Sequence, residues 1–313
     1  SKGVVRLIKA ILLTTLFFEA VGAILSFIVF VQDYPPLKAM EISIFHSIAA
    51  FNNSGFDILG GLQNLIPYQS DVLLNFVTCG LIIFGGLGFL VILDVLKMRS
   101  FKKLCLHSKV VITTSGILLI TGTLLLKVTE DISWLGAFFQ SVSARTAGFS
   151  TYPIGEFSNA GLFILAMLMF IGASPGSTGG GIKTSTFFAL LVSVRSLMTK
   201  KHYGAFHRSI PAEGISKAYM IAFLSLLVVC GGTLLLCILE PGYSFIQLMF
   251  EVTSAFGTVG LSTGITPELG NFSKLLIILI MFIGRLGAFT LASMWVCRPA
   301  PHARYIEESI IIG

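Results

Sequence analysis

Long apolar runs, separated by short polar segments, dominate the pattern of this chain. A helix that crosses the hydrocarbon of a bilayer needs roughly 20 mostly apolar residues, and several runs reach that length. The run at 161–194 qualifies only if a polar break inside it is tolerated. Five others are uninterrupted and predict spanning helices at 7–31, 72–96, 110–128, 215–239 and 274–297. Six spans, an even number, place both ends of the chain on the same side of the membrane.

Composition agrees with this pattern. Of the 313 residues, 55% are hydrophobic and 12% are charged, whereas soluble domains carry about 25% charged residues. The mean hydropathy is +0.90. The first apolar run lacks a small-residue cleavage site and is followed by comparable runs, so we interpret it as a span and not as a signal peptide. The sequence therefore predicts an all-α polytopic membrane protein.

The formal net charge of +6 is distributed unevenly among the connections. Most lysines and arginines lie before the first span, at 97–109, at 195–217 or near the C-terminus, while the alternate connections carry most of the acids. By the positive-inside rule, the basic connections face the cytoplasm. We therefore expect a cell-membrane protein with both termini in the cytoplasm. We expect no nucleic-acid partner, because the positions of the basic residues, in every second connection between spans, are explained by membrane topology.

Signals for enzymatic chemistry are weak. The segment GSTGGGIKTS (176–185) resembles a phosphate-binding loop, but Ile182 separates Gly181 from Lys183, and a hydrophobic helix precedes it instead of a strand. The spans hold no nucleophile–base pair, so we do not expect an enzyme. The odd number of cysteines (Cys79, Cys105, Cys230, Cys237 and Cys297) argues against a disulfide framework. The histidines (His46, His107, His202, His207 and His302) lack the spacing of metal ligands.

Three outer connections share one pattern, a short apolar run followed by small residues. They are IFHSIAAFNNSGFD (44–57), AFFQSVSARTAGFST (137–151) and MFEVTSAFGTVGLST (249–263). Three columns of identical residues align across them and the spans that follow: Phe45, Phe138 and Phe250; Gly55, Gly148 and Gly260; and Gly85, Gly172 and Gly284.

Such self-similarity predicts three copies of one unit, at 1–98, 99–197 and 198–298, followed by a cytoplasmic tail at 299–313. Each unit reads as span, short helix, turn, span. A run of about 11 residues is too short to cross and suits a re-entrant helix. Irregular backbone at that depth must be buried in protein or must line water. Copies that face one another around a pore satisfy this requirement.

The composition of the turns suits a monovalent cation. GTVG (257–260) offers backbone carbonyls, a hydroxyl group and glycines that permit unusual dihedrals, so oxygens can replace a hydration shell. The companion turns NNSG (52–55) and RTAG (145–148) are again small or polar. Half-helices that enter from outside direct their negative C-terminal ends toward the pore centre. The excess of acids outside would also raise the local cation concentration.

With GTVGLSTG, SARTAGFST and the broken span FIGASPGSTGGGIKTS, the chain resembles the Trk/Ktr/HKT family of potassium transporters, and the bacterial Ktr membrane subunits most closely. The resemblance implies four units around a pseudo-fourfold pore. Because three are visible, we expect an N-terminal repeat to be missing from the chain. The implied function is channel-like potassium uptake, with Na⁺ as an activator. The alternative is a sodium- or proton-coupled cation symporter of the same fold.

The family also implies which residues form the selectivity filter. Arg145 places a cation beside a cation site, so we expect its side chain to turn away, toward Glu251 or toward backbone carbonyls. The resemblance assigns K⁺ binding, mainly by backbone carbonyls, to Asn52, Asn53, Ser54, Gly55, Arg145, Thr146, Ala147, Gly148, Gly257, Thr258, Val259 and Gly260.

The broken span implies a gate. A continuous helix over 161–197 would run about 55 Å, nearly twice the hydrocarbon thickness, so it must break, and Pro175 with its neighbouring glycines is where it can. In the related transporters this segment is an intramembrane gate loop. Arg285 is expected to be a pore barrier or a partner of the loop, whereas Lys183 either belongs to the gate or extends to the cytoplasmic interface. The implied gate residues are Ala173, Ser174, Pro175, Gly176, Ser177, Thr178, Gly179, Gly180, Gly181, Lys183 and Arg285.

Partners follow mainly from the resemblance. It implies a homodimer with one pore per protomer, and a cytoplasmic RCK-type ring, like the Ktr regulatory subunit, that binds adenine nucleotides. The basic segments 97–109 and 195–217 are expected to dock that ring, with anionic membrane lipid as the alternative. We expect the apolar end SIIIG (309–313) to be buried at a subunit interface. Glu19, inside the first span, is expected to pack against another polar group, or to serve as a proton-linked site.

Overall fold

The computed structural model describes residues 2–199, 204–287 and 290. In these residues the chain is mostly helical, as predicted, with one two-stranded hairpin, β1 (Gly204–Ala205) and β2 (Arg208–Ser209). The predicted tail 299–313, with His302 and the apolar end 309–313, lies outside the described residues, as do His202 and Cys297. The helices are α1 (Lys2–Phe30), α2 (Pro36–Phe51), α3 (Val72–Leu87), α4 (Phe89–Met98), α5 (Leu106–Thr129), α6 (Trp134–Ser143), α7 (Asn159–Phe170), α8 (Thr184–Thr199), α9 (Ala212–Leu239), α10 (Phe245–Gly257) and α11 (Asn271–Leu286).

Three helices in this part of the chain are long and apolar enough to cross a membrane by themselves: Val4–Phe30, Leu106–Thr129 and Ala212–Leu239. Each presents large apolar side chains on its exposed surface, among them Leu16, Ile120 and Phe223. A water-soluble protein would bury such residues, whereas hydrocarbon solvates them. These three helices agree with three of the predicted spans, and the protein is a membrane protein.

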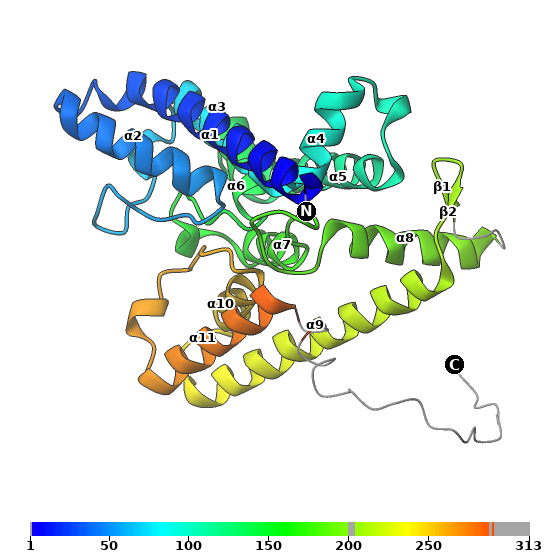
Figure 1. Cartoon of the computed structure of the whole chain (residues 1–313). Coiled ribbons are helices and arrows are strands. Elements are labelled where there is room, and N and C mark those ends of the chain that lie inside the picture. Colours follow the sequence, from blue (N-terminus) through cyan, green and yellow to red (C-terminus); the bar gives the residue numbers. More distant parts are fainter. Residues whose placement is uncertain (1, 200–203, 288–289, 291–313) are drawn as a thin grey trace.

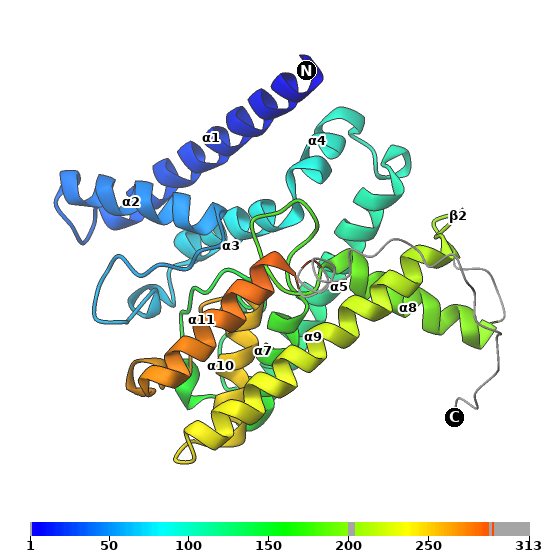
Figure 2. The same ribbon diagram turned by 60° about the horizontal axis from the view of Figure 1, so that its bottom comes forward.

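The predicted span at 72–96 is wrong in one respect. The structure divides it into α3 and α4, which meet at an angle of 97°. Gly88 has φ 89 at this bend, and a Cβ atom there would lie 2.7 Å from the carbonyl oxygen of Pro175. The amide of Phe89 donates to the carbonyl of Gly176 at 3.4 Å. The helix bends because the loop between α7 and α8 lies against it (Figure 2). The predicted span at 274–297 is described as a helix up to Leu286, and Gly287 follows with φ 87.

Nine of the described helices pack in three groups of three, which are α1–α2–α3, α5–α6–α7 and α9–α10–α11 (Figure 1). In each group the middle helix contacts both of its neighbours. In each group, a glycine of the first helix allows the helices to come close. In the first two groups, a Cβ atom added to this glycine would lie within 3 Å of side chains from both other helices, and in the third group it would lie within 3 Å of a side chain from α11. Small residues serve this purpose in membrane helix packing. These glycines, which the sequence analysis did not single out, are Gly22, Gly122 and Gly232.

Gly85, Gly172 and Gly284 each allow a backbone to come close. A Cβ atom at Gly85 would lie 1.9 Å from the carbonyl oxygen of Phe51, and one at Gly284 would lie 1.8 Å from that of Phe256. These two carbonyls end the short helices α2 and α10 in equivalent positions. At Gly172 the neighbour is instead the carbonyl of Gly180, at 1.9 Å, because the helix has already broken there.

We predict that Gly284→Ala strongly destabilises the protein, since the methyl group would overlap a backbone carbonyl that no rotamer change can move. Overpacking of this kind costs roughly 1–3 kcal/mol or more. Gly80→Ala is the matched control, because Gly80 also lies in a helix but has nothing within 4 Å of the added carbon. Thermal unfolding in detergent would measure both. Equal melting temperatures for the two variants would contradict this packing.

Candidate functional site

The three predicted filter turns share one pattern of backbone φ angles. In each, the second and fourth residues have positive φ, the region that favours glycine, so the fourth position is glycine in all three. The chain reverses direction there, directly after the short helices α2, α6 and α10. The residues and their φ values are Asn53 (50°) and Gly55 (62°), Thr146 (77°) and Gly148 (82°), and Thr258 (49°) and Gly260 (96°).

The turns lie side by side. A Cβ atom at Gly55 would be 2.3 Å from the carbonyl oxygen of Ala147, and one at Gly148 would be 2.1 Å from that of Val259. The first turn therefore contacts the second, and the second contacts the third, through closely approaching backbone atoms. The structure thus brings together residues from three segments that lie far apart in the sequence. Backbone oxygens, which these turns offer, are the ligand type that replaces the hydration shell of a monovalent cation.

Two polar side chains of the first turn, Asn52 and Ser54, bond within their own repeat, whereas Asn53 contacts the hydroxyl of Thr146 in the second turn at 3.4 Å. Asn52 donates to the carboxylate of Glu19 in α1, with 2.9 Å between nitrogen and oxygen, and also to the carbonyl of Ile48. Glu19 therefore has the polar packing partner that we expected. The hydroxyl of Ser54 donates to the carbonyl of Ala49 at 3.0 Å. These bonds tie the turn to its own repeat and leave its backbone to face the next turn.

Glu251 organises the segment after the third turn, a role that the sequence analysis missed. This buried carboxylate, in α10, accepts hydrogen bonds from the hydroxyl of Ser262 (2.8 Å), the amide and hydroxyl of Thr263 (2.8 and 3.0 Å) and the hydroxyl of Thr266 (2.5 Å). The hydroxyl-rich sequence LSTGIT after the turn is the signal that could have revealed it. Because Glu251 is engaged here, the expectation that it pairs with Arg145 is wrong.

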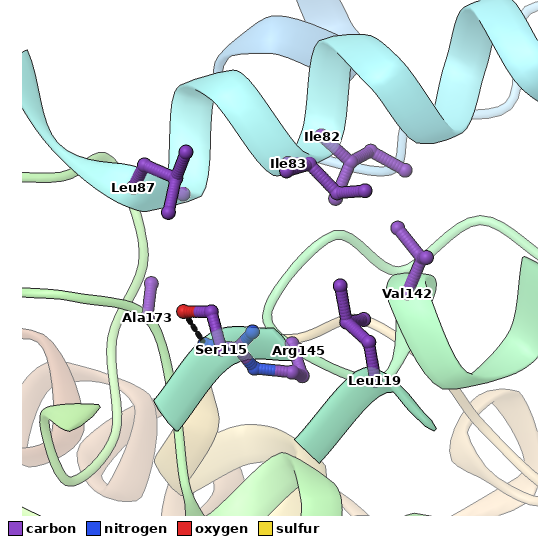
Figure 3. Close-up of a pocket in the computed structure, with 9 residues that line it drawn as sticks. Ile82, Ile83, Leu87, Ser115, Leu119, Val142, Arg145 and Ala173 are labelled. Atoms are coloured by element: carbon purple, nitrogen blue, oxygen red, sulfur yellow. Dashed lines mark hydrogen bonds between the residues drawn. The ribbon is translucent and has the colours of Figure 1, made fainter. Parts of the chain in front are cut away.

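Arg145 instead points into a small cavity between α3 and α5 (Figure 3). Its side chain is 8% exposed and donates to the hydroxyl of Ser115 at 3.3 Å. The cavity measures about 20 Å³, which is room for roughly one water molecule. In the described part of the chain, Arg145 has no carboxylate within 4.0 Å and its Nε has no hydrogen-bond partner. Its charge therefore lies behind the second turn, beside Ala173 of the broken span.

The broken span is resolved into two helices, α7 and α8, joined by residues 171–183. The two ends of this loop stay together, because Ile171 and Ile182 form a short parallel bridge. Ser174 is buried and receives a hydrogen bond from Thr184 at 3.0 Å, while its amide donates to the carbonyl of Gly86. The loop is therefore an ordered structure, held partly by its own ends and partly by the bend after α3.

The tip of the loop packs against the filter turns. A Cβ atom at Gly179 would lie 2.1 Å from the hydroxyl oxygen of Thr146, and one at Gly180 would lie 2.5 Å from that of Thr258. No larger residue could occupy either position without moving a turn. The glycines are thus explained by close approach to two turns at once, and the loop lies directly beside the residues whose backbone oxygens gather.

Two cations hold neighbouring carbonyls of the loop. The ammonium of Lys183 donates to the carbonyl of Gly179 at 2.5 Å, so the expectation that this side chain extends to the interface is wrong. The guanidinium of Arg285, near the end of α11, donates to the carbonyl of Thr178. Arg285 thus connects the loop to the third group of helices.

Comparisons with known proteins agree on one family. The family model described as a cation transport protein, TrkH, matches residues 2–115 and 106–302. Ktr system potassium uptake protein B of Vibrio alginolyticus is 38% identical over 98% of this chain and 70% of its own length. Potassium/sodium uptake protein NtpJ of Enterococcus hirae is 37% identical over 99% of this chain and 72% of its own length.

A solved structure shares the fold. The crystal structure of the potassium transporter TrkH from Vibrio parahaemolyticus matches with a TM-score of 0.74 at 19% sequence identity, over 92% of this chain and 64% of the other. The chain therefore spans about 70% of the length of these curated relatives and less than two thirds of the TrkH chain. On the strength of the family match and of relatives above 30% identity over nearly its whole length, this chain belongs to the TrkH family of cation transport proteins.

Proposed function

We propose that the protein takes up potassium across the cell membrane through a channel-like filter, and that the loop between α7 and α8 gates it. The observation that carries this proposal is the contact of Gly179 and Gly180 with Thr146 and Thr258. A glycine-rich loop pressed against the turns whose oxygens gather is placed where it can block an ion path. Relatives named as potassium uptake proteins support K⁺ as the transported ion.

In this proposal the three turns are three sides of the filter, and the three groups of helices are repeats of one unit. K⁺ binds to the backbone oxygens of 52–55, 145–148 and 257–260. The short helices direct the negative ends of their dipoles toward the ion, which offsets part of the free energy that the ion loses with its water shell. Arg145 faces the cavity behind the second turn, so its charge does not occupy the path.

The gate works as an element with two arrangements of similar free energy. In the described arrangement, Lys183 and Arg285 hold the carbonyls of Gly179 and Thr178, and the loop obstructs the path. When these bonds are released, the glycines allow the loop to withdraw from the turns. Because Arg285 belongs to α11 and bonds to the loop, a movement of α11 would change the position of the loop.

A sodium-coupled uptake of the same fold is the second candidate. One of the relatives is named a potassium/sodium uptake protein, and backbone oxygens bind either ion. Measurement of K⁺ flux with and without Na⁺ distinguishes the two, since a coupled symporter requires Na⁺ to move with K⁺ whereas a channel needs it at most as an activator.

We also propose the assembly that the family resemblance implies: a homodimer in the cell membrane, with cytoplasmic termini and a cytoplasmic RCK-type nucleotide-binding ring. Two of the relatives are named as parts of a Ktr system, which supports a partner subunit. Adenine nucleotides would then act only through that ring.

Removal of the loop tip tests the gate. In liposomes that carry the full-length protein, deletion of Gly176–Gly181 should raise K⁺ flux and keep the preference for K⁺ over Na⁺. Arg285→Gln should raise flux more mildly, by at most about tenfold, because it removes one charge-assisted hydrogen bond. Lys274→Gln is the matched control, since Lys274 in the same helix donates to the carbonyl of Pro267, far from the loop. Abolished or unchanged flux in the deletion variant would contradict a gating role.

The filter geometry predicts a large effect of Gly148→Ala. The added methyl group would overlap the carbonyl of Val259 and would strain a residue at φ 82, so we expect loss of K⁺ flux or of K⁺ over Na⁺ selectivity. Gly264→Ala separates the two causes, because Gly264 also has positive φ, 97°, but has nothing within 4 Å. Flux ratios measured in mixed K⁺ and Na⁺ solutions would show the difference. Equal effects of both substitutions would argue that strain, and not contact between turns, matters.

Glu251 is expected to fix the third turn. Glu251→Ala leaves four donors on Ser262, Thr263 and Thr266 without their acceptor, and unsatisfied buried groups cost roughly 1–3 kcal/mol each, so both melting temperature and K⁺ selectivity should fall. Glu251→Gln keeps one acceptor oxygen and should retain part of both. If Glu251→Ala lowered stability without any change of selectivity, the carboxylate would not position the filter.

A further inference from the structure

A cavity of about 370 Å³ lies beside the gate loop, between α8 and α9. Its size is within the usual range of small-molecule pockets, roughly 300–1,000 Å³. The loop itself contributes Pro175 to the wall. Lys183, the last residue of the loop, also lines the cavity, and the rest of the polar lining comes from the first turn of α8 and from α9. Its polar residues are Lys183, Ser185, Thr186 and Lys217.

The chemistry of this lining fits an anion. Two lysines, a serine and a threonine are among the residues that line the cavity, and none of its lining residues is acidic. Glu213 is next to Gly214 in the sequence, but its side chain is not part of the wall. Ser185 and Thr186 belong to the first turn of a 16-residue helix, whose backbone amides have no carbonyl partner within the helix. These amides add donors to the side of the cavity where the hydroxyls lie.

Charge balance also calls for an anion here. Lys183 is half-buried, and in the described part of the chain no carboxylate lies within 4.0 Å of its ammonium. Arg285 adds a second positive charge to the same stretch of loop through its bond to Thr178, and it too has no carboxylate within that distance among the described residues. A partly buried charge without an opposite charge is unfavourable. An anion in the cavity would compensate Lys183 directly.

We propose that this cavity binds a phosphate group, and that the bound phosphate withdraws Lys183 from the carbonyl of Gly179 and so releases the gate loop. The inference rests on the proposed function, because it names a regulator of that gate. The ammonium of Lys183 already makes a charge-assisted hydrogen bond to the carbonyl of Gly179, but a phosphate oxygen carries a full negative charge and adds the Coulomb attraction of an ion pair, so phosphate competes well with the carbonyl for the ammonium. Either the phosphate of an anionic lipid or free phosphate supplies this chemistry.

The binding test uses the full-length protein in detergent and inorganic phosphate as the probe, with chloride at equal ionic strength as the reference. Phosphate should raise the melting temperature of the parent. Lys217→Gln should weaken binding about fivefold, the factor expected for the loss of one lysine–anion contact near a membrane surface. Lys103→Gln is the matched control, because Lys103 is an exposed lysine in the other basic segment and lies outside the cavity. The control should bind as the parent does.

The flux test identifies the source of the phosphate. Potassium flux is compared in vesicles of phosphatidylcholine, in vesicles with added phosphatidylglycerol, and in phosphatidylcholine vesicles with free phosphate. A rise that needs phosphatidylglycerol and is lost in Lys217→Gln supports the lipid headgroup. A rise with free phosphate and the same dependence on Lys217 supports the free anion.

Several results would overturn the proposal. The first is a melting temperature that does not rise with phosphate. The second is a loss of binding in Lys103→Gln as large as that in Lys217→Gln. The third is phosphate binding that leaves the potassium flux of an active protein unchanged. A parent protein that carries no potassium under any condition would instead refute the proposed function, and the melting-temperature titration would still decide whether the cavity binds phosphate.

Discussion

Close approach of backbone to backbone is the constraint on which the rest of this structure depends. The turns at 52–55, 145–148 and 257–260 touch through atoms that any side chain would displace, and Gly55 and Gly148 are the points of contact. Once the turns must meet in this way, the helices that carry them must also lie close. Gly85 in α3 and Gly284 in α11 allow the ends of α2 and α10 to pack directly against these helices. The same requirement therefore acts between the turns and in the helix packing that supports them.

The close contact also explains why the segment that packs against the second and third turns is a loop and not a helix. A straight helix through 161–197 would keep its carbonyls for itself and would place side chains against the turns. The break instead presents Gly179 and Gly180 to Thr146 and Thr258, and it frees carbonyls for Lys183 and Arg285. The bend after α3 is a consequence of the same loop, since Gly88 makes room for Pro175.

Much of this could be predicted from the sequence, because repetition and glycine columns are visible in it. The columns that contain Gly55 and Gly85 marked the turns that meet in the structure and the close helix contacts, and the broken span was evident from Pro175 and its glycines. The bend at Gly88 was not, because its cause lies almost 90 residues further along the chain. The partner of Arg145 and the role of Glu251 were missed for a related reason. Hydrogen-bond partners of buried charges depend on which elements meet in space, and spacing along the chain does not encode that.

The loop between α7 and α8 is held in place differently from a helix. A helix is held by a ladder of bonds that form together, whereas the bonds of this loop tip are scattered and include two charge-assisted bonds to neighbouring carbonyls. Such bonds contribute roughly 1.5–3 kcal/mol each, and the exposed Arg285 lies toward the weaker end because water screens it. Their sum is comparable to the few kcal/mol that separate alternative packings of a switching element. In the proposed gate, a single competing charge near Lys183 would therefore be enough to change which arrangement of the loop is the more stable.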